Sequence, residues 1–439
     1  MRGLGPILAA LLVLAPARGA AQGAAPQPLT LAGAVRRAMD NAPGVAAASY
    51  RVDETRARLG EARARLLPSL SLAGTWLNRT ENLASFGLSI PGFPSFVPPF
   101  DNYDARVHFD QTVLDVSGWQ HLRAEGYQAT GSEADRTATV QAAAGGAALA
   151  YLRAVRATSL LEARQADSSI AAQLLALAQA QVQAGVSAPL DATRARVQLV
   201  AAQGALIVAR NQRQKADIDL ALALGADAGT AWELADTLTG DLGASLAPPD
   251  TAAALVLALQ RRADLASETA VGERARAERR SIAYERLPRI DFAADYGPNG
   301  RTLPSALATQ DIALVVSIPL LDGFRREARS AEQGAVAQQS EARVGDLRRR
   351  IAAQVRSALL DLGSGQEQHG VAEERLSLAV EELDEARERF ASGVAGNIDV
   401  ITAQANLNLA RDAEIDSRYA TAEARVRLAA ATGVVDTIH

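Results

Sequence analysis

The chain has 439 residues, of which 48% are hydrophobic and only 4% aromatic, so Ala, Val and Leu supply most of its apolar surface. Small apolar side chains at this density favour closely packed helices over a large aromatic core. The absence of cysteine excludes disulfides, thiolate metal sites, a cysteine nucleophile and an N-terminal lipid-modified cysteine. A net charge of −5 argues against a protein that binds nucleic acid through charge, and Lys215 lacks the flanking residues of a phosphate-binding loop.

The first residues have the pattern of an export signal. Arg2 provides a positive start, residues 7–14 an apolar run, and residues 19–21 the small side chains that a signal peptidase accepts. We therefore predict a signal peptide over residues 1–21. The alternative is a membrane anchor, but the run falls well short of the ~20 apolar residues that a span needs. Export without a membrane-spanning helix predicts a protein of the periplasm, the exterior or the outer membrane.

Internal repetition appears at a period of roughly 210 residues. Segments 67–72, 114–115, 183–191 and 220–225 recur, in the same order, as 287–292, 321–322, 391–399 and 428–433. Gly and Pro residues between the copies are typical of a linker. The prediction is a first repeat at 22–228, a linker or equatorial region at 229–250, a second repeat at 251–434 and a C-terminal tail at 435–439.

Each repeat is expected to follow the order helix, strand, loop, strand, long helix, turn, helix. Apolar residues three and four positions apart in the long helices have the 3.5-residue period of a coiled coil. A helix over 116–184 would be about 100 Å long, which predicts a tall tube in which two shorter helices stacked end to end match it. The first repeat is predicted to hold a helix at about 31–66, strands at 69–80 and 104–114, and helices at 116–184 and 189–225. The second is predicted to hold a further helix, strands at 289–297 and 309–318, and helices at 323–392 and 397–432.

The predicted strands alternate apolar and polar residues, as strands between lipid and a polar lumen do. An ordinary surface hairpin explains this alternation equally well, and the export signal favours the transmembrane interpretation. Four strands cannot close a barrel, whereas three chains would supply twelve. Two chains would supply eight, which is too narrow to conduct a sizeable cargo. The residues predicted to face lipid are Leu70, Leu72, Trp76, Val107, Phe109, Phe292, Tyr296, Leu314 and Val316.

The two-copy order, the junction Ser317-Ile318-Pro319-Leu320-Leu321-Asp322-Gly323 and the paired turns at Gly185 and Gly393 resemble the TolC-like outer-membrane efflux channels. The resemblance covers about 29–434, although the first-copy junction at 111–115 lacks the proline and glycine. It implies a mainly α fold with a small β part: a homotrimer with a long antiparallel coiled-coil helical barrel in the periplasm and a 12-stranded β-barrel in the outer membrane. It also implies a periplasmic adaptor (a membrane fusion protein) and an inner-membrane pump or ABC transporter as partners.

An acidic cluster near the end of the second long helix is the candidate periplasmic gate. Glu381, Asp384, Glu385 and Glu388 recur at helical spacing and would present rings of carboxylates in a trimer. The resemblance implies the same, because family members carry acidic rings near the periplasmic mouth on this helix. The alternative is a solvated helix face with local pairs such as Glu385 with Arg389.

The turns between the long and short helices are the candidate docking tips for an adaptor. Glycine is needed there to reverse the chain, and an apolar valine stands beside it in both copies. A trimer would repeat this surface six times, and the family implies that such tips receive the helical hairpins of an adaptor. The predicted docking residues are Gly185, Val186, Ser187, Gly393, Val394, Ala395 and Asn397.

No residues have the spacing of a catalytic, cofactor or metal site, since the four histidines are scattered along the chain. The leading hypothesis is therefore a passive exit duct of a tripartite efflux or type I secretion system, whose cargo (drug, metal ion or protein) the sequence leaves open. The rival hypothesis is a periplasmic coiled-coil adaptor or scaffold. Segment 85–101, rich in Pro and Phe, is predicted to be neither helix nor central strand. We interpret it as an extracellular loop that caps the duct, and the sequence leaves open the alternative of a wedge embedded in the outer membrane.

Overall fold

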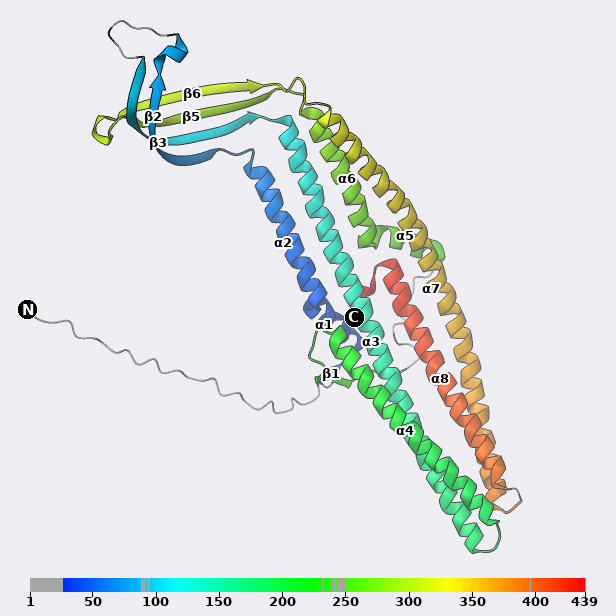
Figure 1. The fold of residues 1–439 in the computed structure, drawn as a ribbon. Coiled ribbons are helices and arrows are strands. Elements are labelled where there is room, and N and C mark those ends of the chain that lie inside the picture. The colour runs from blue at the N-terminus through cyan, green and yellow to red at the C-terminus, as the bar shows by residue number, and fades with distance from the viewer. Residues whose placement is uncertain are drawn as a thin grey trace, which may run out of the picture.

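The computed structural model describes residues 27–87, 92, 95–230, 232–238, 242, 250–394 and 396–438. The predicted signal peptide (1–21), Ala395 and much of the predicted linker lie outside the described residues. The molecule is long and narrow, with one four-stranded sheet at one end and helical hairpins at the other (Figure 1). Among the residues that the structure describes, no helix is both long and apolar enough to cross a membrane.

The first half of the chain and the second half have the same order of elements. Each runs through a short helix, a medium helix, two antiparallel strands, one very long helix and a final helix (Figure 1). The first half contains α1 (Leu31–Asn41), α2 (Pro43–Ala64), β2 (Ser69–Asn82), β3 (Phe96–Leu114), α3 (Val116–Gln183) and α4 (Pro189–Ala223). The second contains α5 (Thr251–Arg261), α6 (Ala263–Tyr284), β5 (Arg289–Gly300), β6 (Leu307–Ser317), α7 (Arg325–Ala391) and α8 (Asn397–Thr432).

The helices form one curved layer in which α3 and α7 run the full height. In the half of the layer nearer the sheet, the helices follow one another in the order α2, α3, α6, α7. In the half nearer the hairpin tips, the order is α4, α3, α8, α7 (Figure 1). Helices α2 and α4 therefore stack end to end along α3, as the helix lengths predict. Alanine dominates the buried positions, which lets the helices approach closely, and larger side chains such as Tyr151 and Leu220 fill the core at mid-height.

The predicted continuous helix over 31–66 is wrong, because the chain breaks between α1 and α2. Pro43 begins α2 and has no N–H with which to continue the preceding helix, so Ala42 is extended. The residues that follow the end of α4 pack against the chain at this break. At Gly225, with φ +67°, a Cβ would lie 2.4 Å from the carbonyl oxygen of Asn41, so only glycine permits this approach.

A small parallel pair of strands at mid-height was not expected. Strand β1 (Gln27–Leu29) pairs with β4 (Trp232–Leu234), which lies inside the predicted linker. The hydroxyl of Tyr151 on α3 lies 2.9 Å from both the carbonyl oxygen of Leu29 and the carboxylate of Asp236. The predicted tail also joins this region, since Val435 is fully buried in the mid-height core.

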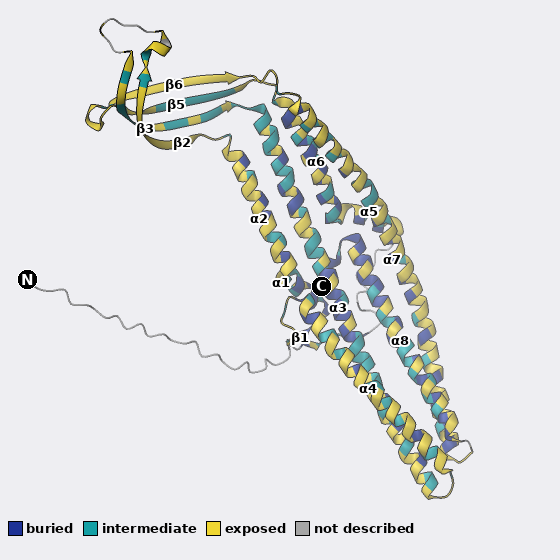
Figure 2. Cartoon of the chain, viewed as in Figure 1, coloured by how far each residue is buried: buried dark blue, intermediate teal, exposed yellow. Residues whose placement is uncertain are grey.

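The sheet has the antiparallel order β2-β3-β5-β6, and its strands are mostly exposed or half-buried (Figure 2). Strand β3 begins at Phe96 rather than at the predicted 104, so the loop prediction is wrong for residues 96–101. These residues pair only with β2, because β5 ends opposite Tyr103. Prolines are tolerated there because one side of the strand has no partner and the ladder is irregular between Arg79 and Glu81.

Candidate functional site

The register of the sheet places all nine residues predicted to face lipid on one face. Leu72 pairs with Val107, Val107 with Tyr296, and Phe292 with Leu314, and directly paired residues point to the same side. The rings of Phe109 and Phe292 meet edge to face with their centroids 6.0 Å apart. Six of the nine side chains are more than half exposed: Leu70, Leu72, Trp76, Tyr296, Leu314 and Val316. This apolar face therefore has no cover within the described chain.

The opposite face of the sheet is polar and carries a connected charge network. The Arg106 guanidinium donates from Nε to Asp104 at 2.8 Å and from Nη1 to Asp295 at 2.6 Å. The same Nη1 lies 3.3 Å from Asp311, so one arginine faces carboxylates from three strands. Gly297 lies beside it, where a Cβ would come within 2.0 Å of a β3 carbonyl oxygen. An apolar face and a charged face on the same strands suit a sheet between lipid and water.

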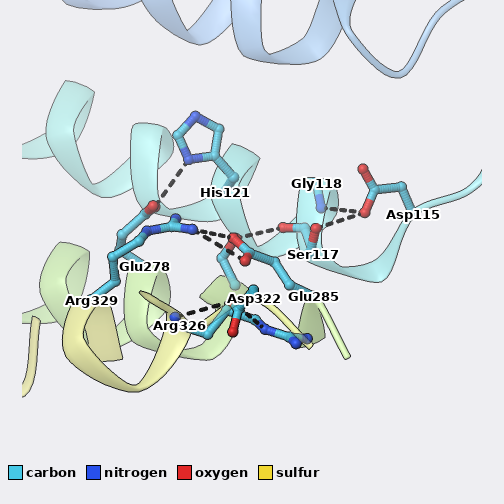
Figure 3. Close-up of polar contacts among 10 residues, drawn as sticks. Asp115, Ser117, Gly118, His121, Glu278, Glu285, Asp322, Arg326 and Arg329 are labelled. Atoms are coloured by element: carbon cyan, nitrogen blue, oxygen red, sulfur yellow. Dashed lines mark hydrogen bonds and ion pairs between the residues drawn. The ribbon is translucent and has the colours of Figure 1, made fainter. Parts of the chain in front are cut away.

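Two aspartates hold the strands to the long helices (Figure 3). Asp115 caps α3, and its Oδ1 accepts hydrogen bonds of 2.8 Å from the Gly118 amide and the Ser117 hydroxyl. Its counterpart Asp322 accepts from Nε of Arg326 at 2.7 Å and from the Arg326 amide at 3.2 Å. The repeated Leu-Asp pairs of the sequence therefore mark the two points at which the strands pass into helices.

Ion pairs between helices fix the same junction (Figure 3). His121 of α3 lies 2.9 Å from Glu278 of α6, and Arg329 of α7 donates to Glu285 at 2.8 Å. The hydrogen bond with Glu278 raises the pKa of His121, and the same bond lowers the pKa of Glu278. The stability from His121 is lost as the pH rises through its raised pKa, and that from Glu278 as the pH falls through its lowered pKa. The pair therefore contributes its full stabilisation between pH 4.5, the ordinary pKa of a glutamate, and pH 6.5, the ordinary pKa of a histidine.

Sequence reasoning missed an exposed apolar stripe on α4. Leu190, Val197, Val200 and Ile207, with Thr193 and Gly204 at the positions between them, follow the alternating spacing of three and four that marks a coiled-coil seam. Val197, Val200 and Ile207 are each more than 60% exposed, on the side of α4 that faces away from α3. The spacing alone could have identified this seam. In the half of the layer nearer the hairpin tips, α4 and α7 are thus the two edge helices, just as β2 and β6 are the two edge strands of the sheet.

The two hairpin tips are exposed and lie against each other. Gly185 and Gly393 both have φ of +74°, and each is followed by a valine that is about 70% exposed. Asn397, predicted as a docking residue, is instead fully buried, and its Nδ2 donates to the Asp191 carbonyl at 2.7 Å. Its side chain ties the tips together and is not part of the exposed surface. Ser187 donates to the Asp191 carboxylate at 2.6 Å.

The candidate gate residues Glu381, Asp384, Glu385 and Glu388 are all exposed near the end of α7. The buried residues of this segment, such as Leu383 and Phe390, pack against α8, so the carboxylates lie toward the free edge of the layer. Among the described residues, Glu381, Glu385 and Glu388 form no ion pair, and the alternative pair of Glu385 with Arg389 is not formed. Oδ1 of Asp384 lies 3.9 Å from Nη1 of Arg387, one turn along the same helix.

Comparisons with known proteins find one family model, "Outer membrane efflux protein", which matches residues 34–226 and 254–434. No curated protein sequence matches the chain. Among solved structures, CusC has a TM-score of 0.80 at 18% identity and 92% coverage of both chains. A membrane protein from Pseudomonas aeruginosa has 0.80 at 20% identity, covering 92% of this chain and 93% of that one. The outer membrane protein VceC from Vibrio cholerae has 0.78 at 18% identity, covering 92% and 96%. At these identities the likeness shows the fold.

Proposed function

Because the chain belongs to the outer membrane efflux protein family, we propose that three copies of it form an exit duct through the outer membrane. The observation that carries this proposal is the sheet with one apolar and one charged face and two unpaired edge strands, β2 and β6. An open sheet edge is not tolerated in lipid, since each unsatisfied backbone group there costs several kcal/mol. Pairing β6 of one chain with β2 of the next would close twelve strands, with the apolar face toward lipid.

The helix layer supports the same closure. Three curved layers would form a tube that extends from the membrane into the periplasm, with the α4 edge of one chain against the α7 edge of the next. The apolar stripe of α4 would then be buried in a coiled-coil seam. A periplasmic adaptor or scaffold, the rival hypothesis, would leave the apolar face of the sheet uncovered in water.

The duct would have no catalytic step and would conduct passively. We propose that the exposed hairpin tips, with Gly185, Val186, Ser187, Gly393 and Val394, receive a periplasmic adaptor. An inner-membrane pump or ABC transporter would supply the energy, which places the duct in a tripartite efflux or type I secretion system. The cargo class depends on that partner.

We further propose that Glu381, Asp384, Glu385 and Glu388 form three-fold rings of negative charge at the periplasmic mouth. Neutralising Asp384→Asn together with Glu388→Gln should lower the cation-to-anion permeability ratio at least about twofold, since fixed charge in a narrow pore selects ions. The measurement is the reversal potential of the reconstituted protein in a planar bilayer under a salt gradient.

A matched control removes the same two charges from exposed positions on α2, by Asp53→Asn with Glu61→Gln. The exposed Gln179→Ala change in the first copy is a second control, and both should leave the permeability ratio nearly unchanged. The gate assignment is wrong if the α2 variant shifts the reversal potential as much as the α7 variant, or if neither shifts it.

A further inference from the structure

A cavity of about 390 Å³ opens where the sheet passes into the long helices. Its wall is formed by the end of β6, the start of α7, the start of α3, the end of α6 and the start of β5, where Arg289 is paired with Asp291. The residues that matter here are Asp115, Glu285, Ser317, Asp322, Arg325 and Arg326. The cavity adjoins the capping network of Figure 3.

Arg326 presents an unsatisfied donor in this wall. The residue is only 6% exposed, its Nε is bonded to Asp322 and its Nη2 lies 3.4 Å from the Pro319 carbonyl oxygen. Its Nη1 is buried and has no hydrogen-bond partner among the described residues. A buried donor on a charged group that stays unpaired destabilises the folded chain, so the site is built for an acceptor.

The carboxylates of the wall are already engaged. Asp115 caps α3, Glu285 accepts from Arg329, and Asp322 accepts from Arg326. The guanidinium of Arg325 is exposed and has no hydrogen bond or ion pair with a described residue. Arg325 is also the first residue of α7, where the helix dipole adds positive potential. The charge that the cavity can still receive is therefore negative.

An apolar collar lies directly beside this positive site. Leu320 and Leu321 are 89% and 83% exposed, and Phe324 is 74% exposed. Phe324 has φ of +65°, a left-handed conformation that is strained in a non-glycine residue. The chain thus holds a large aromatic ring outward at a cost in free energy. A ligand with an anionic head and apolar tails satisfies both the cavity and the collar, whereas a small anion satisfies only the cavity.

We propose that this cavity binds the phosphodiester headgroup of a phospholipid, with Arg325 and Nη1 of Arg326 as its donors and with acyl chains along Leu320, Leu321 and Phe324. The proposal rests on the proposed function, which puts this junction at the periplasmic surface of the outer membrane. Clustered arginines beside exposed apolar side chains are typical of headgroup contacts at such a surface.

The test is native mass spectrometry of the purified full-length protein in detergent, titrated with phosphatidylglycerol. The wild-type protein should retain about one lipid per chain. Arg325→Glu should reduce the bound fraction at a given lipid concentration roughly tenfold, the loss of about one charge-assisted contact. Arg325 is exposed, so this variant should fold. Arg326→Lys, which removes Nη1 and keeps the charge, should also weaken binding.

The control is Arg348→Glu, which makes the same charge change at an exposed position farther along α7 and should bind lipid as the wild type does. Two further probes separate the sources of the interaction: inorganic phosphate should compete weakly, and diacylglycerol, which has the same tails without phosphate, should not remain bound. The proposal is overturned if Arg325→Glu retains lipid like the wild type, whether or not the variant remains a trimer. It is also overturned if inorganic phosphate binds as well as the lipid. A protein that is not a trimer from the outer membrane refutes the proposed function instead.

Discussion

Replacing Val200 and Ile207 on α4 by glutamate is expected to convert the trimer into monomers. Both side chains are more than 60% exposed in one chain and lie in the apolar stripe that the proposed seam buries. Burying such a side chain contributes about 1.5–3 kcal/mol, and an unpaired carboxylate at the same place costs considerably more. The change occurs at three seams of each trimer. The mass of the purified protein in detergent, from light scattering corrected for detergent, measures the result.

The control for this prediction is Gln203→Glu. Gln203 is also exposed on α4 but lies on the flank of the stripe, so its charge should leave the trimer intact. A trimer that persists in the Val200→Glu, Ile207→Glu variant would show that α4 does not form the seam. A monomer in the control as well would show only that added charge destabilises this helix.

Leu314→Arg on β6 is expected to prevent most of the protein from assembling in the outer membrane. Leu314 is 65% exposed on the apolar face, and an arginine facing the middle of a bilayer costs about 2–4 kcal/mol in a barrel strand. Three chains add this cost three times. The fraction of protein that bands with outer membranes on a density gradient, and that resists unfolding by detergent without heating, measures the effect.

The adjacent residue offers a matched control, because Ala313 lies on the opposite, charged face of the same strand. Ala313→Arg should assemble nearly as the wild type does. If Ala313→Arg is excluded from the membrane and Leu314→Arg is tolerated, the two faces of the sheet are assigned the wrong way round.

Periodicity and turn chemistry made much of this fold predictable. The two-residue alternation identified the strands, the spacing of three and four identified the long helices, and Gly185 and Gly393 marked the hairpin ends. The break at Pro43 was also visible in the sequence, since a proline inside a helical pattern ends the helix before it. By contrast, no residue type marks the equivalent break at Arg262. The strand at 96–101 was missed because prolines argue against a strand unless one side is known to be unpaired.

The polar part of the candidate site could not be read from the sequence, because its partners are far apart in the chain. His121 and Glu278 are 157 residues apart, and Asn397 and Asp191 are 206 residues apart. Pairs of this kind depend on which helices become neighbours, and local patterns carry no information about that. Asn397 looked like a tip residue for this reason, although it is a buried link between two tips.

The claim that neighbouring chains close the barrel can be tested most directly by disulfide cross-linking, because the chain contains no cysteine. Leu72→Cys on β2 is combined in turn with Ile312→Cys, Leu314→Cys or Val316→Cys on β6, which samples the possible registers between chains. The pair Leu72→Cys and Val107→Cys, which face each other within one chain, shows that oxidation works in this sheet. In oxidised membranes, at least one β2–β6 pair should give covalent dimers and trimers and nothing larger on a non-reducing denaturing gel. If the pair within one chain forms while every β2–β6 pair stays monomeric, these edges do not meet and the account is wrong.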